Sequence, residues 1–153
     1  MARYKKVVFV STGGTCRSIL AKAVFNKFND IQGIEAVSRG QVVLFEEPVN
    51  QKVEAVAKAK GYSLEGEKSE QLTMDDFGDD NLVLVMTDIL KKKLYEDFED
   101  AINVYSVREF AGEAVGLDSV YGGELPEYGE LIDKTEKLIK LVIERIKEIS
   151  KDI

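Results

Sequence analysis

Residues 6–29 constrain the fold more than any other stretch of this chain, because a buried strand, a tight turn and a helix follow one another there without a break. Residues 6–10 read Lys-Val-Val-Phe-Val, a short β-branched run typical of a buried strand. The turn-forming cluster 11–15 follows directly. A helix is predicted over 17–29, because Leu20, Val24 and Phe28 recur four residues apart on one face. This unit is typical of parallel α/β folds.

The same alternation continues to the end of the chain. Further strands are predicted over 34–38, 82–86 and 101–105, and further helices over 48–61, 89–95 and 128–149. A long loop is expected over 112–129, which is rich in glycine and acidic residues. We therefore expect one α/β domain over residues 1–153, a four-stranded parallel sheet with helices on both faces. The 11–15 turn then lies at the carboxyl end of the first strand, where such folds bind ligands.

The composition excludes several function classes. The chain has no histidine, so Ser-His-Asp and Cys-His arrangements are impossible, and its single cysteine excludes internal disulfides and cysteine-rich zinc sites. A carboxylate-only Mg²⁺ or Ca²⁺ site remains conceivable, but no EF-hand spacing is present, and we expect no metal and no cofactor. The net charge of −7 argues against binding to nucleic acid or to an anionic membrane. No apolar run approaches a membrane span or a signal-peptide core, so a cytoplasmic location is expected.

Residues 11–18, Ser-Thr-Gly-Gly-Thr-Cys-Arg-Ser, have the composition of a phosphate-binding loop. Successive backbone N–H groups and a helix N-terminus can converge on an anion there. Gly13 and Gly14 permit positive φ, Arg17 can hold two phosphate oxygens, and Ser18 can hydrogen-bond back into the loop. Short glycine turns are also common structural connections, and Arg17 could be a solvated surface residue. The spacing alone does not decide between the two. No Gly-Lys-Ser/Thr ends the loop, so it is not a nucleotide P-loop.

Residues 10–18 resemble the signature of the low-molecular-weight protein tyrosine phosphatases: Val-Cys, any residue, Gly-Asn, any residue, then Cys-Arg-Ser-Pro. The family pattern of a nucleophile, five residues and an arginine falls on Ser11 and Arg17. Residues 38–40, Ser-Arg-Gly, resemble the Ser-Ala-Gly that follows the family's second strand, and residues 82–87 resemble its apolar strand ending in methionine. Residues 116–123 stand where the family carries its acid loop. The resemblance covers nearly the whole chain.

The resemblance implies a mechanism and a set of site residues. In the family a cysteine thiolate attacks phosphorus, the arginine holds the phosphoryl oxygens, and an aspartic acid protonates the leaving oxygen. These roles fall here on Ser11, Arg17 and Asp118, although Asp118 could instead cap a turn, with Glu113 and Glu124 as nearby alternatives. The implied partner is a phosphorylated protein or a small phosphomonoester, with phosphate or sulfate in the loop. The implied binding residues are Thr12, Gly13, Gly14, Thr15, Cys16, Arg17, Ser18 and Tyr121.

Ser11 is the main departure from the family pattern. A serine hydroxyl is far less acidic than a thiol, and no histidine is present to act as a base. The residue should therefore bind phosphate but attack it poorly. Two functions stay open: an impaired phosphatase, or an inactive pseudophosphatase that binds phosphate or phosphoprotein. The serine could be an engineered trapping substitution, a mark of a natural pseudophosphatase, or a natural nucleophile with slow turnover. Departures at Gly14, Ile19 and Ser119 favour natural divergence.

The substrate class is open on the sequence. Phosphotyrosine enzymes of the family carry aromatic side chains at the pocket mouth, and Phe45, Tyr121 and, more weakly, Tyr128 are the candidates here, each of which could be ordinary packing. Thr15 points elsewhere, because similar bacterial protein-arginine phosphatases carry threonine at that position, where the tyrosine enzymes have a larger aliphatic residue. Arsenate reductases share the fold but need further cysteines that this chain lacks.

Overall fold

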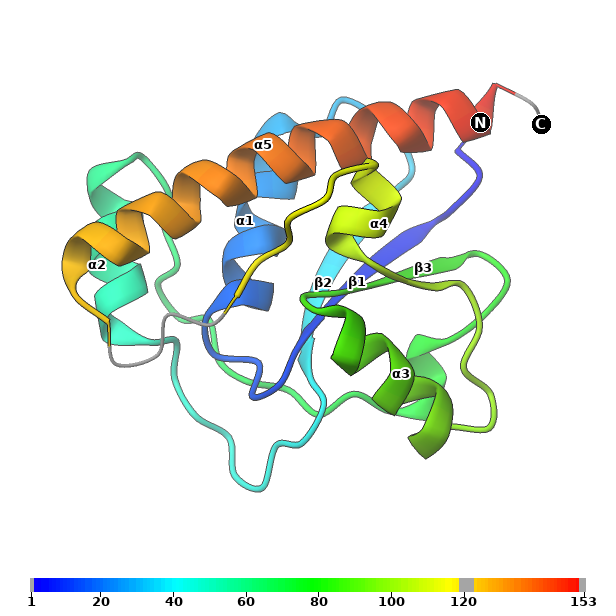
Figure 1. The fold of residues 1–153 in the computed structure, drawn as a ribbon, viewed down its shortest axis with the longest axis horizontal. Coiled ribbons are helices and arrows are strands. Elements are labelled where there is room, and N and C mark those ends of the chain that lie inside the picture. The colour runs from blue at the N-terminus through cyan, green and yellow to red at the C-terminus, as the bar shows by residue number, and fades with distance from the viewer. Residues whose placement is uncertain (1, 119–122, 152–153) are drawn as a thin grey trace.

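The computed structural model describes residues 2–118 and 123–151 (Figure 1). It is an α/β fold built on a parallel four-stranded sheet of order β2-β1-β3-β4, which confirms the predicted fold class. The strands are β1 (Lys6–Ser11), β2 (Glu35–Gly40), β3 (Asn81–Val85) and β4 (Val104–Ser106). The helices are α1 (Arg17–Phe28), α2 (Gln51–Ala59), α3 (Asp88–Asp97), α4 (Val107–Ala111) and α5 (Leu125–Ser150), with a 3₁₀ turn at Met74–Asp76.

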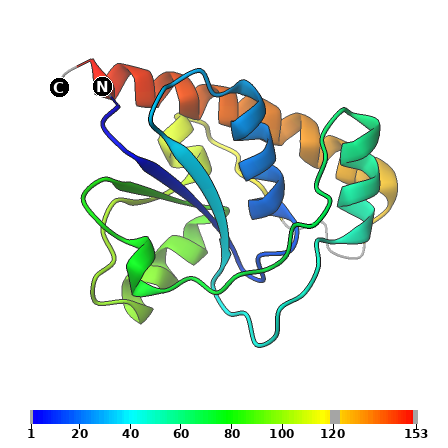
Figure 2. The ribbon, with the colours of Figure 1, turned by 180° about the vertical axis from the view of Figure 1, so that it is seen from behind.

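Strand β1 lies inside the sheet and is covered on both faces. Val7 and Phe9 face the core that contains residues of α1, α4 and α5, whereas Val8 and Val10 face a second core that contains Leu90 of α3. Figures 1 and 2 show the same division, with α5 and α1 on one side of the sheet and α3 on the other. Burial on both faces explains why the strand reads as a continuous apolar run.

Two helices begin three residues away from the predicted position, whereas α3 begins one residue before it. Helix α5 begins at Leu125 instead of residue 128, with a proline in its first turn, where the missing N–H has no helical partner to lose. The predicted 112–129 loop is correspondingly shorter. Helix α2 begins at Gln51 instead of residue 48, because the side chain of Asn50 accepts hydrogen bonds from the amides of Lys52 and Val53 and caps the helix.

The short helix α4 was not predicted. It begins after Ser106, whose hydroxyl accepts a hydrogen bond from the amide of Glu109 at 3.2 Å, while the Glu109 carboxylate accepts one from the amide of Ser106 at 3.2 Å. This reciprocal pair is a capping box, which the Ser-x-x-Glu spacing could have indicated. Strand β4 is shorter than the predicted strand 101–105 and ends one residue later, because only residues 104–106 pair with β3.

Candidate active site

The 11–18 loop connects the carboxyl end of β1 to the N-terminus of α1, beside the end of β2. Ser11 is paired with Gly40 in the parallel register. Gly14 has φ +72°, and a Cβ at this position would lie 2.8 Å from the amide nitrogen of Gly40. A Cβ at Gly40 would in turn lie 2.8 Å from the carbonyl carbon of Gly13. Glycine is therefore required at Gly14 and Gly40, because two backbones meet there.

Both loop glycines permit positive φ, and Gly14 adopts it whereas Gly13 does not. A Cβ at Gly13 would meet no atom within 4 Å. The absence of a side chain at Gly13 thus leaves open space above the loop instead of relieving a clash.

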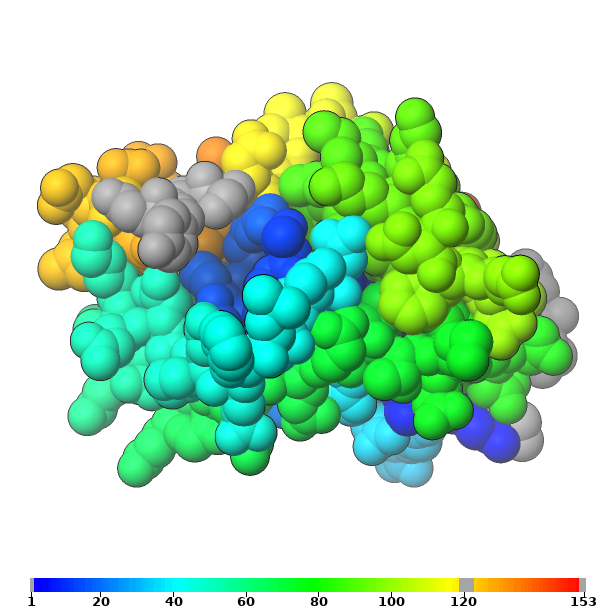
Figure 3. Space-filling view, turned by 90° about the horizontal axis from the view of Figure 1, so that it is seen from below, coloured from blue at the N-terminus to red at the C-terminus, as the bar shows by residue number. Residues whose placement is uncertain are grey.

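The loop lines a hollow of about 360 Å³, which we call the loop hollow. In Figure 3 the blue loop residues lie at the bottom of a depression beside the cyan segment that follows β2. The hydrogen bonds from the amides of Gln41 and Val42 to the carbonyls of Ser11 and Thr12, at 2.9 and 3.2 Å, tie this segment to the loop. The lining residues are Ser11, Thr12, Gly13, Gly14, Thr15, Cys16, Arg17, Glu47, Asn50 and Tyr128.

Glu47 and Asn50 were not predicted as site residues. Both come from the segment after β2, which reaches the loop through tertiary contacts, among them a 2.9 Å hydrogen bond from the Asn50 amide to the Thr15 carbonyl. Tyr128, expected only as a weak aromatic candidate, is buried and lines the hollow, whereas Phe45 is 75% exposed and does not. Tyr121 lies outside the described residues.

Three buried serine hydroxyls form a chain that ends at Ser11. Ser38 Oγ donates to Ser18 Oγ at 2.8 Å, and Ser18 Oγ lies 2.8 Å from Ser11 Oγ. Either hydroxyl of the Ser18–Ser11 pair can be the donor; because Ser38 already donates to the fully buried Ser18, we infer that Ser18 gives its own hydrogen to Ser11. The Gly14 amide also donates to Ser11 Oγ, at 3.1 Å. Ser11 Oγ therefore accepts two hydrogen bonds, and its own hydrogen is left for a group in the loop hollow.

The N-terminus of α1 faces the same hollow without a side-chain cap. Helices α2 and α3 are capped by the side chains of Asn50 and Thr87, but within residues 2–118 and 123–151 no side chain caps the first turn of α1. The first N–H groups of a helix have no intrahelical partner, and together with the helix dipole they favour an anion. The loop is therefore electrostatically suited to hold an oxyanion.

Arg17 connects the loop to the segment after α4. Its Nη1 donates to the Leu117 carbonyl at 2.9 Å, and no other hydrogen bond joins the guanidinium to a described residue, so its remaining N–H groups can serve a ligand. Burial lowers the pKa of Arg17, and the charges that Cys16 and Asp118 carry when they are ionised oppose that shift. Asp118 is exposed and lines a neighbouring hollow of about 250 Å³ instead of the loop hollow. Asp118 therefore acts on the loop through the electrostatic effect of its charge on Arg17, and it does not itself line the loop hollow.

Cys16 is not poised as a nucleophile. Burial raises the pKa of its thiol to about 11, and the charge of Arg17 only partly opposes this effect. The thiolate is the reactive form, so Cys16 is protonated and inert near neutral pH. Within residues 2–118 and 123–151 no group of three Asp, Glu or Cys side chains could hold a metal ion, and no helix is long and apolar enough to cross a bilayer.

Glu47 is the acidic side chain that lines the loop hollow. It is exposed, and in the described part of the chain its carboxylate is in no ion pair, whereas the carboxylate of the adjacent Glu46 pairs with Lys68 at 3.3 Å. The hollow therefore combines an anion-holding floor with one negative charge on its wall. A ligand that carries both an anionic and a cationic group fits this distribution.

Fold and loop together define an α/β protein of phosphatase architecture. The family model of low molecular weight phosphotyrosine protein phosphatase matches residues 6–152, and the chain belongs to this family. The curated relatives include the low molecular weight protein-tyrosine-phosphatase PtpB of Staphylococcus epidermidis, which is 26% identical over 135 residues, covering 88% of this chain and 94% of PtpB.

Solved structures of similar chains agree with the fold. The YwlE arginine phosphatase from Geobacillus stearothermophilus is 26% identical and superposes with a TM-score of 0.84 over 96% of each chain. A cysteine-to-serine mutant of the YwlE arginine phosphatase, with a phosphorylated active-site serine, is 25% identical and has a TM-score of 0.84, covering 95% of this chain and 98% of the mutant.

Proposed function

We propose that this chain is a protein phosphatase that holds a phosphoryl group in the 11–18 loop and turns it over slowly through Ser11. Arg17 holds the phosphoryl oxygens, and Asp118 is the general acid. The observation that carries the proposal is the position of the Ser11 hydroxyl, which lines the loop hollow, accepts a hydrogen bond from the Gly14 amide and lies 2.8 Å from Ser18 Oγ. Its oxygen is thereby fixed in place beside the uncapped N-terminus of α1.

The reaction has two steps. In the first, Ser11 Oγ forms a bond to phosphorus, the bond from phosphorus to the leaving group breaks, and Asp118 gives the leaving group a proton. The Ser11 proton passes to a phosphoryl oxygen or to water, since the chain has no histidine to take it. In the second step the Asp118 carboxylate takes a proton from water, whose oxygen bonds to phosphorus; the bond from phosphorus to Ser11 Oγ breaks, Ser11 Oγ regains a proton from a phosphoryl oxygen or from water, and orthophosphate leaves. An alkoxide is a poorer leaving group than a thiolate, so the phosphorylated form of Ser11 is expected to accumulate.

The mutant relative supports the first step. In that protein a serine that replaces the active-site cysteine is phosphorylated, on a chain of 25% identity with the same fold. A serine hydroxyl in this loop architecture is thus able to accept a phosphoryl group in a related protein.

The second candidate function is a binding module that captures phosphate or a phosphoprotein without turnover. The same protonated hydroxyl favours it, because no histidine is present to act as the base. The two functions are separated by p-nitrophenyl phosphate hydrolysis and intact-protein mass, measured for the chain itself and for Ser11→Cys and Ser11→Ala.

The proposed phosphatase is expected to gain the mass of one phosphoryl group on Ser11 and to turn over slowly. Ser11→Cys should hydrolyse the substrate roughly 10²–10⁴-fold faster, the factor that a general base typically supplies and the serine lacks. Ser11→Ala should neither react nor gain mass. Turnover with Ser11→Cys alone, with no phosphorylated Ser11, would establish the binding module. Turnover in no variant would count against the roles of Arg17 and Asp118 together.

For the substrate, we propose a phosphorylated arginine side chain in preference to phosphotyrosine. The guanidinium of a phosphoarginine keeps a positive charge beside the phosphoryl group, and Glu47 offers an unpaired carboxylate on the wall of the loop hollow. Thr15 lines the same hollow and is smaller than the aliphatic residue expected of tyrosine enzymes. A phosphotyrosine ring would bring no charge for Glu47 to match.

The preference is tested in the Ser11→Cys background with one peptide sequence carrying either phosphoarginine or phosphotyrosine. Glu47→Gln should lower kcat/KM for the phosphoarginine peptide by up to about fivefold, the range of an exposed charge pair. The matched control Glu46→Gln should leave it unchanged, because that carboxylate is paired with Lys68 away from the hollow. If Glu47→Gln raised kcat/KM for both peptides equally, Glu47 would act only by repelling the phosphoryl charge.

A further inference from the structure

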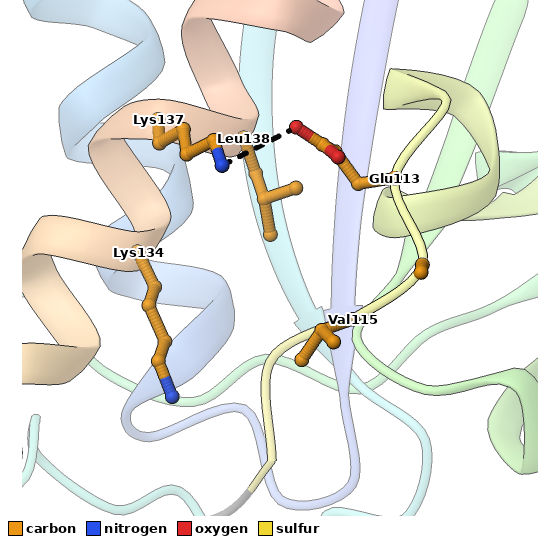
Figure 4. Close-up of a pocket in the computed structure, with 7 residues that line it drawn as sticks. Glu113, Val115, Lys134, Lys137 and Leu138 are labelled. Atoms are coloured by element: carbon orange, nitrogen blue, oxygen red, sulfur yellow. Dashed lines mark ion pairs between the residues drawn. The ribbon is translucent and has the colours of Figure 1, made fainter.

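A third hollow lies between α5 and the segment 113–116, outside the loop hollow and the hollow that Asp118 lines. Its volume is about 350 Å³, at the lower end of the range of small-molecule sites. We call it the α5 hollow. Figure 4 shows Val115 and Glu113 on one wall and Lys134, Lys137 and Leu138 of α5 on the other.

The α5 hollow combines an apolar interior with an unpaired cation. The side chain of Val115 is 66% exposed at its edge, and that of Leu138 is buried at its base. Lys137 pairs with Glu113, with Nζ 3.5 Å from Oε1, and this pair closes one end (Figure 4). Lys134 is exposed and makes no ion pair with any described residue. An apolar body with a single negative charge matches this arrangement.

The segment that forms the wall is held at its ends but not in its middle. At one end the Glu113 amide donates to the Arg108 carbonyl at 2.8 Å, and at the other the Leu117 carbonyl accepts from Arg17. No hydrogen bond to a described residue holds the backbone of 114–116. These three residues line the α5 hollow on one side and the hollow that contains Asp118 on the other. A ligand in the α5 hollow would therefore fill space against the part of this wall whose backbone makes no hydrogen bond to a described residue.

We propose that the α5 hollow binds a small organic anion with an apolar body, such as an arylcarboxylate or arylsulfonate, and that its occupation strengthens oxyanion binding in the 11–18 loop. The coupling follows from the Leu117 carbonyl, which orients the Arg17 guanidinium. A ligand that fixes 114–116 fixes this carbonyl, and so lowers the entropic cost of holding Arg17 against an oxyanion. The coupling half of the proposal rests on the proposed oxyanion site.

Binding at the α5 hollow is tested with the fluorescent arylsulfonate anilinonaphthalene sulfonate. One molecule is expected to bind per chain. Lys134→Gln should weaken binding by up to about fivefold, as loss of an exposed charge pair does, and Lys134→Glu should weaken it further. Lys140→Gln and Lys140→Glu are matched controls, because Lys140 is exposed on the same helix but does not line the hollow. Val115→Ser should weaken binding independently of charge.

The coupling is tested by titrating orthophosphate in the presence and absence of saturating anilinonaphthalene sulfonate. The phosphate dissociation constant is expected to fall about fivefold, and by reciprocity phosphate should tighten the probe by the same factor. Equal effects of the Lys134 and Lys140 variants on probe affinity would overturn the site. Loss of probe binding in Phe45→Ser would also overturn it, because Phe45 is exposed and does not line the α5 hollow. Probe binding that leaves phosphate affinity unchanged would overturn the coupling. If phosphate bound under no condition, the proposed function would fail, while the probe titrations would still decide the site.

Discussion

Replacing Ser18 by alanine removes the middle of the hydroxyl chain that fixes Ser11. Ser18 is fully buried and takes part in two hydrogen bonds, each 2.8 Å long, with Ser38 and with Ser11. Without it, the Ser38 hydroxyl has no acceptor and the Ser11 oxygen keeps only the Gly14 amide as a donor. The perturbation therefore leaves a buried donor unpaired and loosens Ser11.

The expected loss of stability follows from these partners. A buried polar group left without a partner costs about 1–3 kcal/mol, so Ser18→Ala should lower the free energy of unfolding by that amount. Ser38→Ala is the matched control. It removes only the first donor and leaves the bond from Ser18 to Ser11 intact, for an expected loss of about 0.5–1.5 kcal/mol. In a domain of this size, each kcal/mol corresponds to about 2–4 °C in Tm.

Chemical unfolding of the two variants at neutral pH measures the difference, with circular dichroism as the probe. Ser18→Ala is expected to lose more stability than Ser38→Ala, with an unchanged denaturant m-value. A loss in Ser38→Ala equal to or greater than that in Ser18→Ala would refute the direction of the chain. The hydroxyl of Ser11 would then donate toward Ser18 instead of toward the loop hollow.

Two further predictions concern the backbone contact and the cysteine. In Gly40→Ala the new Cβ would lie 2.8 Å from the Gly13 carbonyl carbon, so the loop must shift. Orthophosphate titration should then show about tenfold weaker binding, and chemical unfolding should show a free energy of unfolding that is lower by about 1–3 kcal/mol. The control Gly78→Ala, whose Cβ meets its nearest neighbour at 3.7 Å, should change neither, and unaltered binding in Gly40→Ala would contradict the close contact. Because burial raises the pKa of Cys16 from 9.0 to about 11, its alkylation by iodoacetamide should keep accelerating up to about pH 11, and a plateau near pH 9 would exclude that burial effect. The unfolded chain ionises first, so this thiol's contribution to stability should decline as the pH rises from 9 towards 11.

The sheet could be predicted because its signal is local. Continuous apolar runs such as 6–10 and 82–86 arise when a parallel strand is buried on both faces, and Val7 and Val8 do face opposite cores. The start of α2 and the presence of α4 depend on single caps. Asn50 sets the start of α2 and Ser106 that of α4, and a cap is a side-chain hydrogen bond that hydrophobic periodicity does not report.

The floor of the loop hollow could be predicted from the 11–18 motif, but its wall could not. Glu47 and Asn50 reach the hollow only because the segment after β2 folds back onto the loop, a tertiary contact with no sequence period. The contact of Gly14 with Gly40 depends on the register that pairs Ser11 with Gly40. The Ser-Arg-Gly motif at 38–40 was the available signal for it, since its serine and glycine both meet the loop.

The donors around residue 11 act differently on a serine than on a thiolate. In Ser11→Cys, the Gly14 amide, the Ser18 hydroxyl and the N-terminus of α1 would all stabilise a thiolate, which then lies beside a phosphate dianion of like charge. Like charges about 4 Å apart repel by about 4 kcal/mol at an effective dielectric constant near 20. Ser11 stays neutral, and its free hydrogen can donate to the anion instead. Ser11→Cys should therefore weaken orthophosphate binding in a titration while it accelerates hydrolysis. Tighter phosphate binding by the cysteine variant would mean that residue 11 does not face the bound anion.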